Sequence, residues 1–153
     1  METDLTLLDP RFRSVLRIEG TIRAMILLAG AVAAEILTPI WPGTFLIPAV
    51  LVAVWLVFIA PMRRFARWGY QFGSDQLRIA RGYLFHSDTV VPLGRIQHID
   101  VRQGPIMRRY GLAELRVHTA GNHNASVNLP GLAHEDALAM RESIRLHIRQ
   151  AQV

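Results

Sequence analysis

Three polar residues at alternate positions, His98, Asp100 and Arg102, have side chains of the types that acid–base chemistry uses. In an extended strand alternate side chains point to one face, so the three would form one polar patch. A hydrolase would also need a nucleophile beside the histidine. Ser87 and Ser126 are the candidates, but no motif places either serine at the patch. We therefore expect no catalytic residues, and an enzyme built on this patch is the third hypothesis for function.

The six histidines and the absence of cysteine limit the metal chemistry that is open to the chain. His118 and His123 flank an expected hairpin and His134 opens an expected helix, without an HExxH motif or a dense Asp/His cluster. Known metal sites combine ligands more densely than this. We read the histidines as polar surface residues and expect no metal and no cofactor. A P-loop and a GxGxxG motif are also missing, so no small-molecule substrate is evident.

The basic residues are all arginine, and most of them lie in the second part of the chain. Before Arg63 there are 4 arginines and 5 acidic residues; from Arg63 on there are 13 and 7. A GC-rich genome explains the preference for arginine, and selection for bidentate anion contacts is the alternative. Nucleic-acid binding would need aromatic residues interleaved with the arginines, which the sequence lacks. A basic domain beside a membrane favours contact with anionic headgroups instead.

Two arginine groups are candidate contacts for a partner or for lipid. Arg108 and Arg109 follow a break at Gly104-Pro105, on an expected loop. Arg141, Arg145 and Arg149 recur every four residues and would form a stripe on a C-terminal helix. Like charges at this spacing repel each other. The stripe is either a solvated helix face or a contact surface for an acidic partner or lipid.

Two apolar stretches, residues 22–41 and 45–62, each approach the ~20 residues that a helix needs to cross a bilayer. Between them lies Pro42-Gly43-Thr44, which reverses the chain but is too short to form a domain. The sequence therefore predicts a transmembrane hairpin over residues 21–62, after a cytoplasmic segment over residues 1–20. Residues 63–153 are left for one domain held at the membrane surface.

Charges and aromatic residues around the hairpin predict its orientation. Arginines precede the first helix and follow the second, whereas the loop between them is uncharged, so both termini are expected in the cytoplasm. Trp41 is expected at the outer interface and Trp68 at the inner one, where aromatic rings prefer to lie. The residues assigned to topology and to the membrane surface are Arg63, Arg64, Arg67 and Trp68.

Two features within the first helix stand out. Ala29, Gly30, Ala33 and Ala34 are small and would let the two helices approach closely. Glu35 is a carboxylate near the outer end of the helix, where a charge is costly. It either has a function within the membrane or lies close enough to the interface to reach water.

After residue 67 the pattern changes to short alternating segments, which are typical of strands. Strands are expected at 68–72, 76–83, 88–92, 96–102 and 115–119, with a polar turn at 120–124 and a last strand that ends at Pro130-Gly131. Apolar residues at helical spacing predict a helix over residues 134–149. The fold class is therefore α+β: a transmembrane hairpin followed by a small β-barrel, with strands over about 68–129, capped by a C-terminal helix.

Four sequence blocks together resemble a known family. They are Ile96-Gln97-His98-Ile99-Asp100-Val101-Arg102-Gln103-Gly104-Pro105, Arg108-Arg109-Tyr110-Gly111-Leu112, Leu115-Arg116-Val117-His118-Thr119-Ala120-Gly121 and Leu129-Pro130-Gly131. With the hairpin before them, they resemble the bacterial pleckstrin-homology (PH) family, of the YdbS-like membrane-flanked type, over residues 9–146. The resemblance implies a PH-like barrel of two nearly orthogonal sheets and a binding or assembly module of the cell envelope. It implies no catalytic residues.

The leading functional hypothesis is a non-enzymatic module that acts by protein contacts or self-association at the inner membrane. Recognition of anionic lipid headgroups by the barrel is the alternative. Eukaryotic PH domains that bind such lipids carry several basic residues around the first strand turn. The corresponding turn here, Gly73-Ser74-Asp75, is short and acidic, which argues against that specific ligand.

Overall fold

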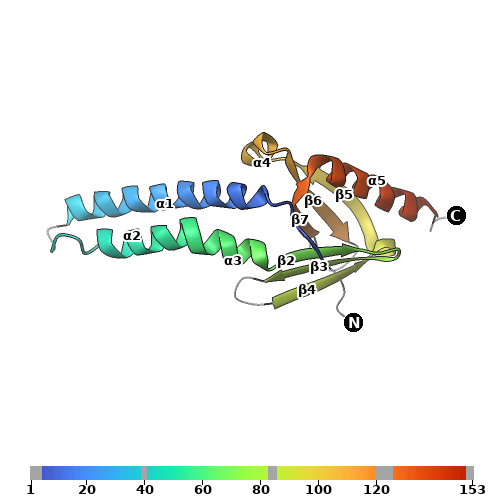
Figure 1. Ribbon diagram of the computed structural model, residues 1–153, viewed down its shortest axis with the longest axis horizontal. Coiled ribbons are helices and arrows are strands. Elements are labelled where there is room, and N and C mark those ends of the chain that lie inside the picture. The colour runs from blue at the N-terminus through green and yellow to red at the C-terminus, as the bar shows by residue number, and fades with distance from the viewer. Residues whose placement is uncertain (1–4, 39–40, 83–85, 120–125, 151–153) are drawn as a thin grey trace. The chain divides into compact units, whose positions relative to one another are not determined.

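The computed structural model describes residues 5–38, 41–82, 86–119 and 126–150. The chain divides into two compact units: one joins Met1–Phe12 to Arg67–Val153, and the other is Arg13–Ala66. Figure 1 labels the helices and strands of both units. The sequence predicts a separate segment at residues 1–20, whereas the structure assigns residues 5–12 to the unit of the strands and residues 13–20 to the helical unit.

The helical unit contains two helices that are long and apolar enough to cross a membrane, Phe12–Leu37 and Leu46–Ala66. The first is α1 (Phe12–Leu37). The second begins as α2 (Leu46–Val54), continues through the π-helical segment η1 (Trp55–Ile59) and ends as α3 (Ala60–Ala66). Thus α1 begins earlier than the apolar stretch that starts at residue 22. Hydropathy does not reveal this earlier start, because the first turns of α1 carry polar residues.

The π-helical segment has a local cause in Pro61. Proline has no backbone N–H and its ring clashes with the carbonyl four residues before it, which in this helix belongs to Val57. Val57 lies within η1. Widening the turn at this point lets the helix continue past the proline instead of ending there.

The small residues at which α1 meets the second helix are not the predicted ones. A Cβ added at Gly20 would collide with the backbone carbonyl oxygen of Leu56, so the two helices approach closely here. Gly30 has open space around it, and Ala29 and Ala33 are exposed. The prediction is therefore wrong for Ala29, Gly30 and Ala33, whereas Ala34 is half-buried; the close approach at Gly20 lies nearer the start of α1.

The second unit contains two antiparallel sheets and a C-terminal helix. The first sheet has the order β1-β2-β3-β4 and the second β5-β6-β7. The strands are β1 (Thr6–Leu7), β2 (Trp68–Phe72), β3 (Gln76–Gly82), β4 (His86–Pro92), β5 (Ile96–Arg102), β6 (Leu112–Thr119) and β7 (Ser126–Ala133). The helical elements are the 3₁₀ turn η2 (Leu93–Arg95), α4 (Pro105–Arg109) and α5 (His134–Gln150).

The core of this unit collects the apolar residues of the alternating pattern. Fully buried side chains come from both sheets and from α5, among them Leu77, Ile79, Leu115, Leu129 and Ile144. Figure 1 shows α5 lying along the three-stranded sheet. The predicted α+β class, with strands first and a capping helix last, is confirmed. The predicted turn at 120–124 lies outside the described residues.

The N-terminal residues supply the fourth strand of the first sheet, which the sequence does not predict. Strand β1 pairs with β2, with Leu7 opposite Gly69. The backbone N–H of Asp9 donates a hydrogen bond of 3.0 Å to the carbonyl oxygen of Gly131. Gly131 has φ +72° and lies against the buried ring of Phe12. Strand β7 therefore does not end at Pro130-Gly131 but continues to Ala133, and Gly131 is where the N-terminal segment docks.

Candidate binding groove

A groove of about 460 Å³ lies between the edge strand β5 and the helix α5. This volume falls in the usual range of ligand clefts, ~300–1,000 Å³. The strand contributes Gln97, His98 and Ile99, and the helix contributes Arg141, Arg145, Ile148 and Arg149. The structure thus brings the predicted arginine stripe together with one residue of the predicted polar patch.

The position of the arginines follows from how α5 packs. Ala137 and Ile144 are completely buried, so they fix the side of α5 that faces the core. Ile148 is half-buried further along the helix and forms part of the groove. The arginine stripe lies beside this apolar side, where the guanidinium groups border the groove and still reach water.

The charge of the groove is only partly neutralised within the protein. Glu142 Oε1 accepts hydrogen bonds from Arg141 at 3.3 Å and from Arg145 at 3.2 Å. Among the described residues no acidic group pairs with Arg149, and the buried Nε of Arg141 has no hydrogen-bond partner. One carboxylate, shared by Arg141 and Arg145, faces three guanidinium groups, so the groove keeps a positive charge that favours an acidic ligand.

The outer face of β5 and β6 carries the polar patch. Asp100 Oδ1 lies 2.9 Å from Nε2 of His98, and Oδ2 lies 3.7 Å from Nε2 of His118 and 3.8 Å from Nη2 of Arg102. The two imidazole rings have their centroids 6.0 Å apart. The carboxylate is therefore surrounded by its own basic neighbours and is balanced locally.

Hydrolysis would also need a nucleophile beside the histidines, and the described residues of the patch do not supply one. Ser126 lies opposite His118 in the strand register, but it is exposed and no hydrogen bond joins the two side chains. The side chain of Ser87 lies outside the described residues. Within the ranges that the structure describes, no group of three or more His, Cys, Asp or Glu residues could hold a metal ion.

The other arginine group lies elsewhere on the barrel. Arg108 and Arg109 form the end of α4 and are exposed. Neither lines the groove. The structure therefore separates the two groups that the sequence offered as candidate contacts, and places one of them in a concave site.

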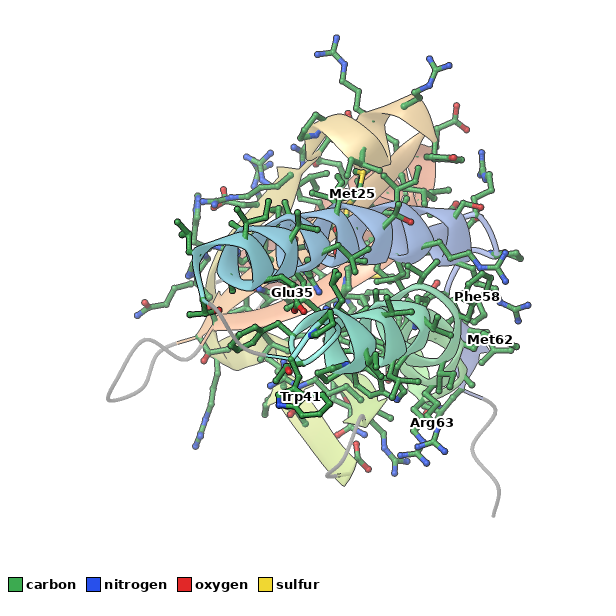
Figure 2. All side chains as sticks on the ribbon, turned by 90° about the vertical axis from the view of Figure 1, so that its left-hand side faces the viewer. Met25, Glu35, Trp41, Phe58, Met62 and Arg63 are labelled. Atoms are coloured by element: carbon green, nitrogen blue, oxygen red, sulfur yellow. The ribbon has the colours of Figure 1, made fainter. Side chains whose placement is uncertain are left out.

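The juxtamembrane arginines lie at the end of the second apolar helix. Arg63 and Arg64 are in the last turn of α3, where basic side chains interact favourably with the helix dipole. Arg67 is exposed, and Trp68 begins β2. Figure 2 shows Arg63 following Phe58 and Met62, which project outward from the helix and are mostly exposed. The outward apolar side chains thus end where the positive charge begins.

Glu35 has a structural partner at the turn of the hairpin. Its Oε1 accepts a hydrogen bond from the backbone N–H of Gly43, and its Oε2 accepts one of 3.0 Å from that of Phe45. These groups lie just before the start of α2, and Figure 2 shows Glu35 pointing toward the second helix. A carboxylate at a helix N-terminus satisfies unpaired donors and the helix dipole. The residue therefore closes the hairpin, a role that neither sequence alternative contained.

The comparisons with known proteins agree with the architecture. A profile described as "Bacterial PH domain" matches residues 22–147, which is most of the chain. The chain belongs to the bacterial PH-domain family. This bacterial PH domain is also 31% identical to the UPF0699 transmembrane protein YdbS of Bacillus subtilis (strain 168), over 90% of the chain and 88% of the relative. No solved structure matches the chain.

Local patterns in the sequence of this bacterial PH domain do not connect β5 with α5. Gln97, Ile99 and Ile148 carry no signal of a site in the sequence, because each is an ordinary residue on its own element. One signal was present: the arginine stripe flanks an apolar helix side, so it must border whatever strand that side covers. Which strand this is depends on the order of the sheet, which no local pattern contains.

Proposed function

We propose that this bacterial PH domain is a membrane-anchored, non-enzymatic binding module whose contact surface is the groove between β5 and α5. The observation that carries the proposal is the concentration of three arginines around a concave site with a single acidic neighbour. The family relation supports a PH-domain protein with transmembrane helices. Membrane anchoring raises the effective concentration of the module at the surface, so that weak contacts suffice for assembly.

The proposal places the groove at the cytoplasmic surface of the inner membrane. Arg11, Arg13 and Arg17 lie at or just before the start of α1, Arg23 lies further along it, and Arg63, Arg64 and Arg67 lie near the end of α3. Basic residues at both ends of the hairpin favour retention of both ends in the cytoplasm. A reporter fused to the C-terminus tests this, since replacing Arg63, Arg64 and Arg67 with Gln is expected to weaken the orientation. An unchanged reporter signal would contradict the assignment.

Site-specific photocrosslinking in membranes tests the contact surface itself. A photoreactive residue at Gln97, in the groove, is compared with one at Arg109, which is exposed but outside the groove. We expect a protein adduct from position 97 that disappears in the R141Q/R145Q variant. An adduct from position 109 alone, or no protein adduct at all, would contradict the proposal.

The same experiment addresses headgroup recognition, which remains the second candidate function. Two observations favour it: the groove has positive charge that its acidic neighbour balances only in part, and the same chain has juxtamembrane arginines. Both groups of arginines would attract anionic headgroups. Mass spectrometry of the adduct distinguishes the two, because a lipid adds a glycerophospholipid mass and a protein adds peptides. A lipid adduct from position 97 would indicate that the groove binds a lipid headgroup and not a protein partner.

A further inference from the structure

The strand that borders the groove has a free edge. In the three-stranded sheet β5 pairs with β6 and lies at the end of the order β5-β6-β7. Among the described residues no strand pairs with its other edge. A β-bulge at the start of β5 disturbs the register between Ile96 and His98, after which residues 98–102 pair regularly with β6. An edge of this kind offers backbone donors and acceptors to an added strand.

The arginines of α5 lie beside this edge with a spacing that suits an extended chain. Residues four apart on a helix are separated by about 6 Å along its axis. In an extended chain, side chains on the same face recur every second residue, at about 6.7 Å. Arg141, Arg145 and Arg149 therefore match three alternate positions of a strand to within about 1.5 Å over their whole length. Figure 1 shows α5 and β5 lying side by side, as their contacts require.

The groove also contains apolar surface between the strand and the arginines. Ile99 of β5 and Ile148 of α5 are both half-buried and line it. Such surface suits the methylene groups of glutamate side chains whose carboxylates reach the guanidinium groups. Arginine holds a carboxylate with two parallel hydrogen bonds, which rewards correct spacing as well as charge.

We propose that the groove binds an extended acidic segment of a partner protein, which adds as a strand to the free edge of β5. Acidic side chains at alternate positions of that segment pair with Arg141, Arg145 and Arg149. The inference rests on the proposed function, because it takes the groove as the contact surface, and it adds the chemistry and the conformation of what binds there. A lipid headgroup would pair with the arginines but would make no use of the strand edge.

Synthetic peptides and the full chain in nanodiscs of zwitterionic lipid test the inference. One peptide contains the core Glu-Val-Glu-Val-Glu and the other contains the same residues as Val-Glu-Glu-Glu-Val, with identical flanks. We expect the alternating peptide to bind about tenfold more tightly, because it presents its carboxylates at the spacing of the arginines. Methylation of the backbone nitrogens on one edge of the alternating peptide should remove binding, whereas methylation on the other edge should not.

Protein variants supply the matched control. R141Q/R145Q should weaken binding of the alternating peptide by about tenfold or more, whereas R108Q/R109Q changes the net charge equally and should leave it within about twofold. Thermal unfolding of each variant verifies that the barrel is intact. Equal affinity for the two peptides, or no effect of methylation on either edge, would overturn the strand-addition inference.

The two proposals fail differently. A protein adduct from position 97 together with indifference to peptide spacing would leave the binding groove in place and refute the extended acidic segment. The absence of both the adduct and peptide binding would refute the proposed function as well.

Discussion

Substitution of Gly131 by alanine tests how the N-terminal segment is held on the barrel. An added Cβ would lie 2.6 Å from Cγ and 3.0 Å from Cβ of Phe12, far inside van der Waals contact. These atoms are at the base of the side chain, so the ring can escape only if Phe12 moves as a whole. Phe12 is 2% exposed, so any such movement disrupts the core around it.

The magnitude follows from two independent costs. A non-glycine residue at φ +72° costs about 1–2 kcal/mol. Overpacking against Phe12 costs about 1–3 kcal/mol more. We therefore expect G131A to lower the free energy of unfolding by about 2–5 kcal/mol. An F12A background removes the two shortest contacts and leaves the tight 3.0 Å approach to the retained Cβ, so G131A should cost less there, close to the ~1–2 kcal/mol of the backbone conformation.

Urea unfolding in detergent micelles measures these values through tryptophan fluorescence. Replacing Trp41 and Trp55 with phenylalanine leaves Trp68, at the start of β2, as the reporter of the barrel. Gly94 is the control, because nothing lies within 4 Å of its added Cβ, and G94A should change stability by less than ~0.5 kcal/mol. If G131A costs the same with Phe12 present and absent, the contact argued from the structure does not exist.

Three further predictions concern the hairpin and the entry to it. Glu35→Ala should lower the thermal unfolding midpoint of the hairpin more than Glu35→Gln, measured by circular dichroism, because Gln retains an acceptor for the hydrogen bonds at the turn. Gly20→Leu should separate the two helices, whereas Gly30→Leu should leave them in place. Disulfide trapping between introduced cysteines measures this separation, because the chain has no cysteine of its own. Equal trapping in both variants would refute the close approach. A side-chain hydrogen bond from Arg11 holds the pKa of Asp9 below its ordinary value of 3.8. Asp9 therefore stabilises the barrel above that pH and loses its effect as the pH falls through the lowered pKa, so the difference in urea midpoint between wild type and Asp9→Asn should be full at pH 7 and vanish in strong acid.

Much of the barrel follows from local patterns. Alternation predicts β5 with the bounds that the structure has, Ile96–Arg102, because inward and outward residues differ clearly along it. The helical spacing of Ala137 and Ile144 predicts α5 to within a residue of its observed end at Gln150. In both cases the element buries one face, so apolar residues recur along its sequence at the period of a strand or of a helix.

The parts that could not be predicted depend on contacts between distant residues. Strand β1 has two residues, too few to show a period. Its partner β2 is far away in the sequence, because the whole hairpin lies between the two strands in the chain. Gly131 reads as a strand end because Pro-Gly normally breaks a strand, and the ring of Phe12 that requires a glycine is remote in sequence. The groove likewise needs the strand order, since β5 is an edge only once the sheet is assembled.

The pairing of β1 with β2 also sets an order on how the protein is made. β1 is synthesised first, but its partner follows only after both apolar helices, so the four-stranded sheet cannot close until the hairpin is complete. If a single helix inserted, β1 and β2 would end on opposite sides of the bilayer and the sheet could never form. Formation of the complete four-stranded sheet therefore requires that both helices have inserted. A chain with a misplaced hairpin would lack the pairing of β1 with β2, and such an incompletely folded chain is a target for quality-control proteases.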